Sequence, residues 1–286
     1  MMSQPLRRRS HGMALIAVLW IVSALSIMVM GLVHNLRGEA RLAGQSRQIA
    51  EAAGLGDAAI HIVLQAMMAR TLQGQRQQGL QVVSVAYGGR DIAVEILPLN
   101  GLINLNSAGA PLLVQMLVVA GVPQNTAQAL AQTIVDARTA RDAQGATRNF
   151  EATEDLLQVP GVDYDLYAKI APLLTADELG GDRVNPMAAP EPVLLVLAGG
   201  DAGKAAAIAT QRAAGATGID TTVLMGDFID NDAATQRFRL TARMPLADGG
   251  TAVVTRSVNL SSSVRDGMPW HTYRFEQRLR EDTAAP

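Results

Sequence analysis

The chain has 286 residues, of which 49% are hydrophobic and only 3% aromatic, and its formal net charge is −2. The length suggests about two domains, and the composition is that of a globular chain whose cores are built from small aliphatic side chains. A net charge near zero gives no general attraction to nucleic acid, and the absence of cysteine excludes disulfides, thiolate metal sites and thiol nucleophiles.

Residues 13–33 form a run without any charged side chain. As a helix rising about 1.5 Å per residue, this run would span roughly 30 Å, the thickness of the hydrocarbon core of a bilayer. Arg7, Arg8 and Arg9 precede it without an acidic residue, which predicts that this end stays cytoplasmic and that the rest of the chain is exported. The far end of the run fits a signal-peptidase site poorly, so we expect the helix to be retained.

The first 12 residues form a short basic leader that ends in Gly12 and is followed directly by Met13. This arrangement resembles the prepilin leader, which prepilin peptidase cuts after the glycine before it methylates the new amine. Prepilins usually carry Glu at the fifth mature position, where this chain has Ala17. The K-type minor pseudopilin of type II secretion systems is similar in lacking that Glu. A plain membrane anchor with basic flanks is the alternative interpretation.

A missing Glu has a physical meaning in a stack of such helices. The Glu of an arriving subunit can neutralise the buried terminal ammonium of the subunit already in place, because an unpaired charge in hydrocarbon costs several kcal/mol. A subunit that enters first has no predecessor to neutralise. Small residues along the run would let neighbouring helices approach closely, namely Ala14, Ala17, Ser23, Ala24 and Gly31.

Helical periodicity continues to about residue 72, and its second half predicts an amphipathic helix that lies on a sheet. Residues 80–87 and 90–97 are rich in β-branched side chains and flank Gly88 and Gly89, which predicts a β-hairpin. We therefore expect a pilin-like helix over residues 13–72 and the first part of a pilin-like sheet over 80–99.

Residues 100–217 show short helical patterns, which predict an inserted all-α domain. An internal repeat lies within it, because Asn104 precedes Pro111 by the same seven residues that separate Asn185 from Pro192. We expect both asparagines to cap backbone donors. Paired asparagine segments of this kind resemble the two boundaries of the helical insert in the K-type family.

Residues 117–134 and 156–170 resemble the helix-hairpin-helix motif, in which a turn offers backbone N–H groups to a DNA phosphate. Pro123 removes one such donor, the carboxylate of Asp163 would repel phosphate, and few basic residues flank either turn. We interpret both segments as structural hairpins of the insert. A membrane-tethered DNA-binding protein is the alternative function.

Strand patterns return in residues 218–286, with predicted strands at 220–230, 236–244 and 251–260. Trp270, Tyr273 and Phe275 suggest one further edge strand. The order of hairpin, helices and strands predicts an α+β fold, in which a long N-terminal helix packs on an antiparallel sheet that the helical insert interrupts.

Candidate chemistry is sparse. Asp227, Asp230 and Asp232 crowd one turn with Asn231, and such oxygen ligands suit Ca²⁺, although we prefer to interpret them as a solvated turn. Residues 199–205 lack the residues of a phosphate-binding loop, and no nucleophile elbow or histidine pair occurs. We therefore expect no enzyme activity and no cofactor other than calcium, which members of the K-type family bind.

The resemblance implies a structural subunit at the tip of the type II secretion pseudopilus, where it initiates or caps assembly for protein export. Its partners would be the I-type and J-type minor pseudopilins and the major pseudopilin, with prepilin peptidase as the processing enzyme and no nucleic acid. The protein would cross the bacterial inner membrane once, with a cytoplasmic N-terminus and periplasmic C-terminal domains.

Overall fold

The computed structural model describes residues 11–75, 79–139, 149–177, 180–216, 218–247, 249–260 and 269–281. It forms two compact units, Met1–Ala52 and Ala53–Pro286. One helix, α1 (His11–Leu72), contributes to both units. The first ten residues of the predicted leader lie outside the described residues.

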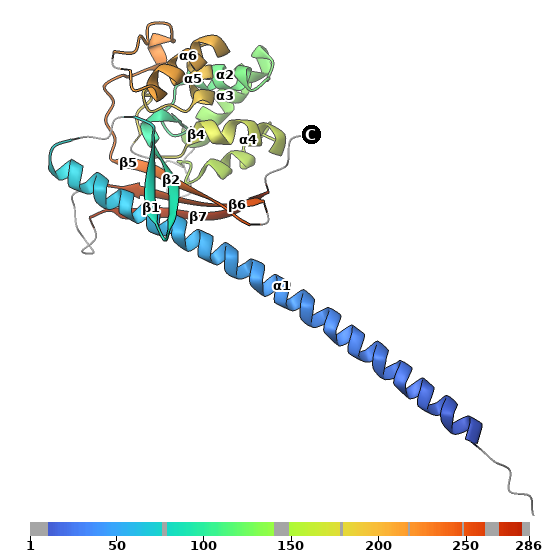
Figure 1. Cartoon of the computed structure of the whole chain (residues 1–286). Helices are drawn as coiled ribbons and strands as arrows, with labels where there is room; N and C mark the ends of the chain where they lie inside the picture. The colour runs from blue at the N-terminus through green and yellow to red at the C-terminus, as the bar shows by residue number, and fades with distance from the viewer. Residues whose placement is uncertain are drawn as a thin grey trace, which may run out of the picture. The chain divides into compact units, whose positions relative to one another are not determined.

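The last third of α1 packs on a sheet within the second unit (Figure 1). Its buried side chains recur at helical spacing and are Ala53, Ala59, Ile60, Val63, Leu64 and Met67. Gly56 permits a close approach, since a Cβ at this position would lie 3.4 Å from the side chains of Ala242 and Val254. The predicted amphipathic helix on a sheet is confirmed.

The sheet has five antiparallel strands in the order β1-β2-β5-β6-β7. They are β1 (Gln81–Tyr87), β2 (Arg90–Pro98), β5 (Arg237–Pro245), β6 (Gly250–Asn259) and β7 (His271–Glu281). Gly88 and Gly89 have φ values of 59° and 74°, so they form the two-residue turn of the predicted hairpin. β5, β6 and the edge strand β7 are likewise confirmed.

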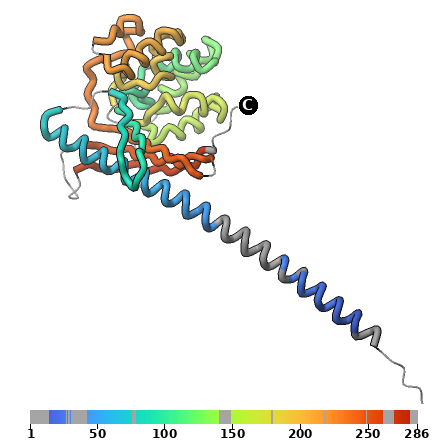
Figure 2. Tube along the Cα trace, viewed as in Figure 1, coloured from blue at the N-terminus to red at the C-terminus, as the bar shows by residue number. Residues whose placement is uncertain are grey.

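The chain leaves the sheet after β2 and returns to it at β5, as the trace in Figure 2 shows. The described helices between these strands are α2 (Ala110–Val119), α3 (Gln124–Thr139), α4 (Tyr164–Ile170), α5 (Glu191–Leu197) and α6 (Ala202–Ala213). Short 3₁₀ helices accompany them: η1 (Leu99–Gly101), η2 (Thr153–Gln158), η3 (Ala171–Leu173) and η4 (Gly226–Phe228). These elements share one hydrophobic core that includes Met116, Ile134, Leu156 and Leu194.

Two expectations for this segment need correction. It is not entirely helical, because β3 (Ile103–Asn104) and β4 (Leu174–Thr175) form a short parallel pair. The predicted strand at 220–230 is wrong, since the Asp220 carboxylate accepts the backbone N–H of Thr222 at 2.9 Å and starts a turn. Within that segment only Ile229 forms a β-bridge among the described residues, with Val184.

The two faces of the sheet have different partners. Side chains alternate along each strand, so Ala242 and Val254 face α1, while Arg237 and Arg239 face the side on which α2 to α6 lie (Figure 1). On the α1 side, Arg256 Nη2 donates to Asp57 Oδ2 at 3.0 Å. The same guanidinium lies 4.6 Å from the centre of the Phe275 ring. This ion pair fixes the last third of α1 to β6.

Candidate functional site

The N-terminal part of α1 exposes a series of large apolar side chains. Their exposed fractions range from 55% to 77%, and the residues are Leu15, Ile16, Val18, Leu19, Trp20, Ile21, Val22, Leu25, Met28 and Met30. Exposure of this kind in water is unfavourable by about 25 cal/mol per Å² of apolar surface. A helix that is apolar on all sides is typical of a membrane span or of the centre of a helix bundle.

The small residues predicted to allow helix packing lie within this series where they are described. Ala17, Ser23 and Ala24 are exposed. Ser26 Oγ donates to the carbonyl of Val22 at 2.8 Å, so this hydroxyl has a partner within the helix. Gly12, Met13, Ala14 and Gly31 belong to α1, but their side chains lie outside the described part of the structure.

Length and hydropathy single out a different part of α1. Among the described residues, Ala43–Leu72 is the helical stretch long and apolar enough to cross a membrane, with a mean hydropathy of 1.4. Its second half is the core helix on the sheet, since side chains such as Ile60 and Leu64 are fully buried there. The described part of the predicted span at 13–33 contains the shorter apolar stretch Leu15–Ser26.

The two repeated asparagines have the same local geometry. The side chain of Asn104 accepts the backbone N–H of Asn106 at 3.0 Å, and that of Asn185 accepts the N–H of Met187 at 2.9 Å. Both side chains are buried, and each amide also donates to a distant carbonyl, that of Asp177 or that of Ala233. Each asparagine thus closes a local turn and ties it to another segment.

Two arginines extend the repeat, and sequence analysis missed both. Arg138, in the last turn of α3, donates to the carbonyls of Leu105 and Ala108. Arg212, in the last turn of α6, donates to the carbonyls of Pro186, Met187 and Ala189. Burial lowers the pKa of both guanidinium groups. A basic residue near a helix C-terminus was the available sequence signal.

The turns of the two helix-hairpin-helix-like segments hold backbone N–H groups that donate within the segments themselves. Gly121 has a φ of 97°, and the N–H groups of Gly121 and Val122 donate to carbonyls of α2. Gly161 has a φ of 95°, the N–H of Val162 donates to the carbonyl of Val159, and Asp163 accepts the N–H of Leu166. These N–H groups are therefore not available to a phosphate.

The three carboxylates of the acidic turn do not gather into one cluster in the described part of the chain. There, no three side chains of Asp, Glu or His form a group able to hold a metal ion, and this includes Asp227, Asp230 and Asp232. The Asp230 carboxylate instead accepts the backbone N–H of Asp232 at 3.0 Å. The alternative of a solvated turn fits this geometry.

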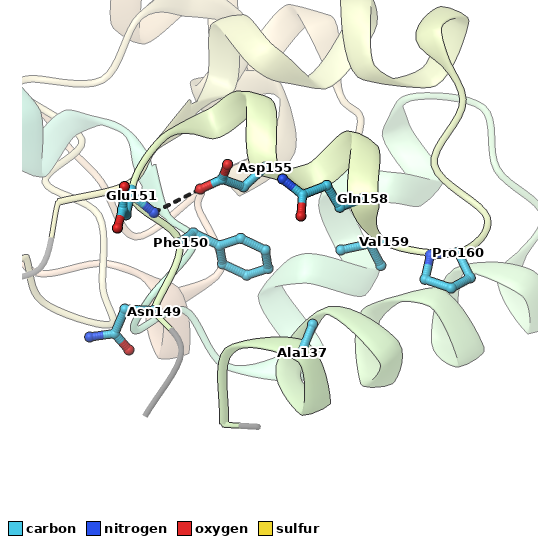
Figure 3. Close-up of a pocket in the computed structure, with 8 residues that line it drawn as sticks. All are labelled: Ala137, Asn149, Phe150, Glu151, Asp155, Gln158, Val159 and Pro160. Atoms are coloured by element: carbon cyan, nitrogen blue, oxygen red, sulfur yellow. Dashed lines mark hydrogen bonds between the residues drawn. The ribbon is translucent and has the colours of Figure 1, made fainter. Parts of the chain in front are cut away.

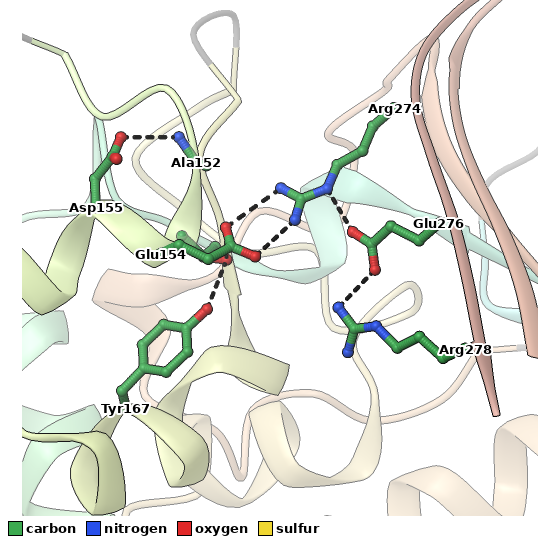
Figure 4. Close-up of polar contacts among 8 residues, drawn as sticks. Ala152, Glu154, Asp155, Tyr167, Arg274, Glu276 and Arg278 are labelled. Carbon is green, nitrogen blue, oxygen red and sulfur yellow. Dashed lines mark hydrogen bonds and ion pairs between the residues drawn. The ribbon is translucent and has the colours of Figure 1, made fainter. Parts of the chain in front are cut away.

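A chain of ion pairs joins η2 to β7 (Figure 4). Arg274 Nη2 lies 2.7 Å from Glu154 Oε1, Arg274 also contacts Glu276, and Glu276 contacts Arg278 at 2.6 Å. Burial alone would raise the pKa of Glu154, but the hydrogen bond from Arg274 and its charge lower it. The same hydrogen bond raises the pKa of Arg274. The network holds the helical segment against the sheet.

A pocket of about 450 Å³ lies beside η2, with Phe150, Val159 and Pro160 among its walls (Figure 3). The Asp155 carboxylate at its edge accepts the backbone N–H of Glu151 at 2.8 Å. No nucleophile with a neighbouring base lines it among the described residues. Its described lining contains no Arg, Lys or His side chain that could pair with an anion, and we assign no ligand to this pocket.

Comparison with known proteins gives a match of fold. No protein-family model matches the sequence, and no curated protein matches it. The crystal structure of the GspK-GspI-GspJ complex from the enterotoxigenic Escherichia coli type 2 secretion system matches with a TM-score of 0.53 and 15% sequence identity. The match covers 83% of this chain and 99% of the matched chain. The chain therefore has a pilin-like α+β fold, similar to a protein of a type II secretion pseudopilin complex.

Proposed function

We propose that the protein is a minor pseudopilin of a type II secretion system, a structural subunit without enzyme activity. The observation that carries this proposal is the difference in burial between the two ends of α1. Its last third packs on the antiparallel sheet, whereas the described large apolar side chains between Leu15 and Met30 are exposed. Pilin-like subunits need both kinds of surface, because one part of the helix packs within the folded domain and the other part inserts into the membrane or the filament. The likeness to the pseudopilin complex supports the proposal.

Within that class we propose the K type, at the tip of the pseudopilus. Ala17 stands where other prepilins carry Glu, so this subunit would enter the stack first. Residues 100–217, which lie between β2 and β5, would form an inserted domain with helix-hairpin-helix-like units and a bulk that blocks further subunits above it. The leader (1–12), helix (13–72) and sheet segments (80–99 and 218–286) complete the proposed organisation.

The proposed membrane placement follows from the same helix. Prepilin peptidase would cut between Gly12 and Met13 and methylate the new amine. The chain would then cross the inner membrane once, with its N-terminus in the cytoplasm and the sheet in the periplasm. Lipid would cover the exposed side chains of α1 before assembly, and helices of the I-type, J-type and major pseudopilins would cover them afterwards.

Co-purification tests the proposed partners. Tagged full-length chain, co-expressed with the I-type and J-type pseudopilins of its own secretion system and extracted in mild detergent, is expected to recover both. Ala24→Leu should reduce recovery, because a larger side chain separates the helices. Ala50→Leu is the matched control, since Ala50 is exposed on the same helix outside the apolar series. Recovery of the tagged chain alone would contradict the proposal.

The nucleic-acid alternative makes the opposite prediction. A membrane-tethered DNA receptor would bind duplex DNA tightly at low salt and retard it in a gel-shift assay, and its affinity would fall steeply as the salt concentration rises. We expect no such shift with the detergent-solubilised chain, because the N–H groups of Gly121, Val122 and Val162 donate to carbonyls of the chain. The carboxylate of Asp163 accepts the N–H of Leu166 and would repel a phosphate. A tight, salt-sensitive shift would favour the receptor.

A further inference from the structure

A second pocket, of about 350 Å³, lies between the helical segment and the sheet face turned away from α1. Three arginines line it, Arg237 and Arg239 from β5 and Arg274 from β7. Hydroxyl groups complete its polar wall, contributed by Thr153, Thr175, Ser257 and Tyr273. A register shift between β6 and β7 at Ser257 occurs next to Tyr273 and Arg274.

The three arginines differ in their partners. Arg237 forms an ion pair with the buried carboxylate of Asp177. Arg274 forms ion pairs with Glu154 and Glu276. In the described part of the chain, by contrast, the guanidinium of Arg239 has neither a hydrogen bond nor an ion pair. Burial lowers the pKa of Arg239, and the charges of Glu276, Tyr273 and Glu154 oppose this effect without cancelling it.

The guanidinium of Arg239 is only partly exposed and keeps N–H donors without a direct partner among the described residues, so an anion that enters this pocket can accept hydrogen bonds from them. The guanidinium of Arg239 presents a planar fork of N–H donors, which matches the two oxygens of a carboxylate. Neighbouring carboxylates balance Arg237 and Arg274, and Glu151 also lines the pocket. Arginines and carboxylates are therefore nearly balanced around the pocket, which favours a singly charged carboxylate over a doubly charged phosphate.

We propose that this pocket binds a carboxylate group, with Arg239 as the cation that holds it and nearby hydroxyls as further donors. The volume accommodates a small organic acid or the end of an acidic side chain. This assignment is independent of the proposed function, because it concerns the sheet face opposite α1. Loss of carboxylate binding would leave the assignment as a pseudopilin untouched.

Calorimetric titration of the detergent-solubilised full chain at low ionic strength tests the proposal. The probes are propionate, a capped Gly-Glu-Gly peptide and inorganic phosphate. We expect saturable binding of at least one carboxylate probe. Comparing the affinities for propionate and for the peptide distinguishes a small organic acid from the side chain of a partner protein. Arg239→Gln should weaken binding about tenfold or more, and Arg239→Lys less, because lysine keeps the charge but loses the fork.

Arg243→Gln is the matched control, because Arg243 lies on the same face of β5, is paired with Glu95 and lies outside the pocket lining. It should bind the probes like the wild type, and thermal melting checks that each variant is folded. Equal weakening by Arg243→Gln, equal affinity for phosphate, or no saturable binding of either carboxylate would overturn the proposal.

Discussion

Replacing Gly101 by alanine is expected to lower the melting temperature of the sheet-containing unit by about 6–12 °C. A Cβ at this position would lie 2.3 Å from both the carbonyl carbon and the carbonyl oxygen of Ala188, and 2.8 Å from its Cβ. These are mainly backbone atoms, which cannot rotate away as a flexible side chain can. Overpacking of this kind costs about 3 kcal/mol, and each kcal/mol shifts the melting temperature of a unit this size by about 2–4 °C.

Gly54→Ala is the control for this substitution. Gly54 is exposed within α1, and an added Cβ there has no atom within 4 Å. Because alanine favours a helix over glycine by about 1 kcal/mol, this variant should melt at or slightly above the temperature of the wild type. Identical melting of Gly101→Ala and wild type in thermal unfolding followed by circular dichroism would show that η1 does not pack against Ala188.

Arg212→Met is expected to destabilise the helical segment by about 3 kcal/mol. The guanidinium donates to three carbonyls, those of Pro186, Met187 and Ala189, and the last of these bonds is 2.6 Å long. Methionine preserves much of the apolar stem but leaves the three acceptors without this donor. Arg138→Met should cost less, about 2 kcal/mol, because Arg138 serves two carbonyls at the equivalent place in the repeat.

Arg70→Met provides the comparison, because Arg70 is exposed in the last turn of α1 and its loss should change stability by no more than about 0.5 kcal/mol. Denaturant titrations of the three variants in detergent give the free energies of unfolding. If Arg212→Met and Arg70→Met unfold at the same denaturant concentration, the arginines of the repeat do not stabilise the fold through these carbonyls.

Sequence patterns predicted the elements whose structure depends on neighbouring residues, namely the last third of α1 and the β1-β2 hairpin. The buried positions from Ala53 to Met67 follow the helical period, and the Gly88-Gly89 turn determines the hairpin. The run 220–230 misled the prediction because its β-branched residues resemble a strand, whereas the Asp220 side chain competes for the backbone of Thr222 and forms a turn.

The candidate site was predictable only in part. The exposed apolar series of α1 is visible in composition alone, and the spacing of Asn104 and Asn185 drew attention to the repeat. Their distant partners were not predictable, because Asp177 lies 73 residues after Asn104 and Ala233 lies 48 residues after Asn185. Arg138 and Arg212 escaped notice for the same reason, as they contact carbonyls between 23 and 33 residues earlier in the chain.

The mature N-terminus tests the central claim most directly. The full chain is purified from the inner membrane of a cell that has prepilin peptidase, and intact-mass and peptide mass spectrometry then identify its first residue. The account predicts a product that begins at an N-methylated Met13, and it predicts that Gly12→Asp leaves residues 1–12 attached. A wild-type product that begins at Met1, or one that begins downstream of Val33, would contradict the assignment as a pseudopilin.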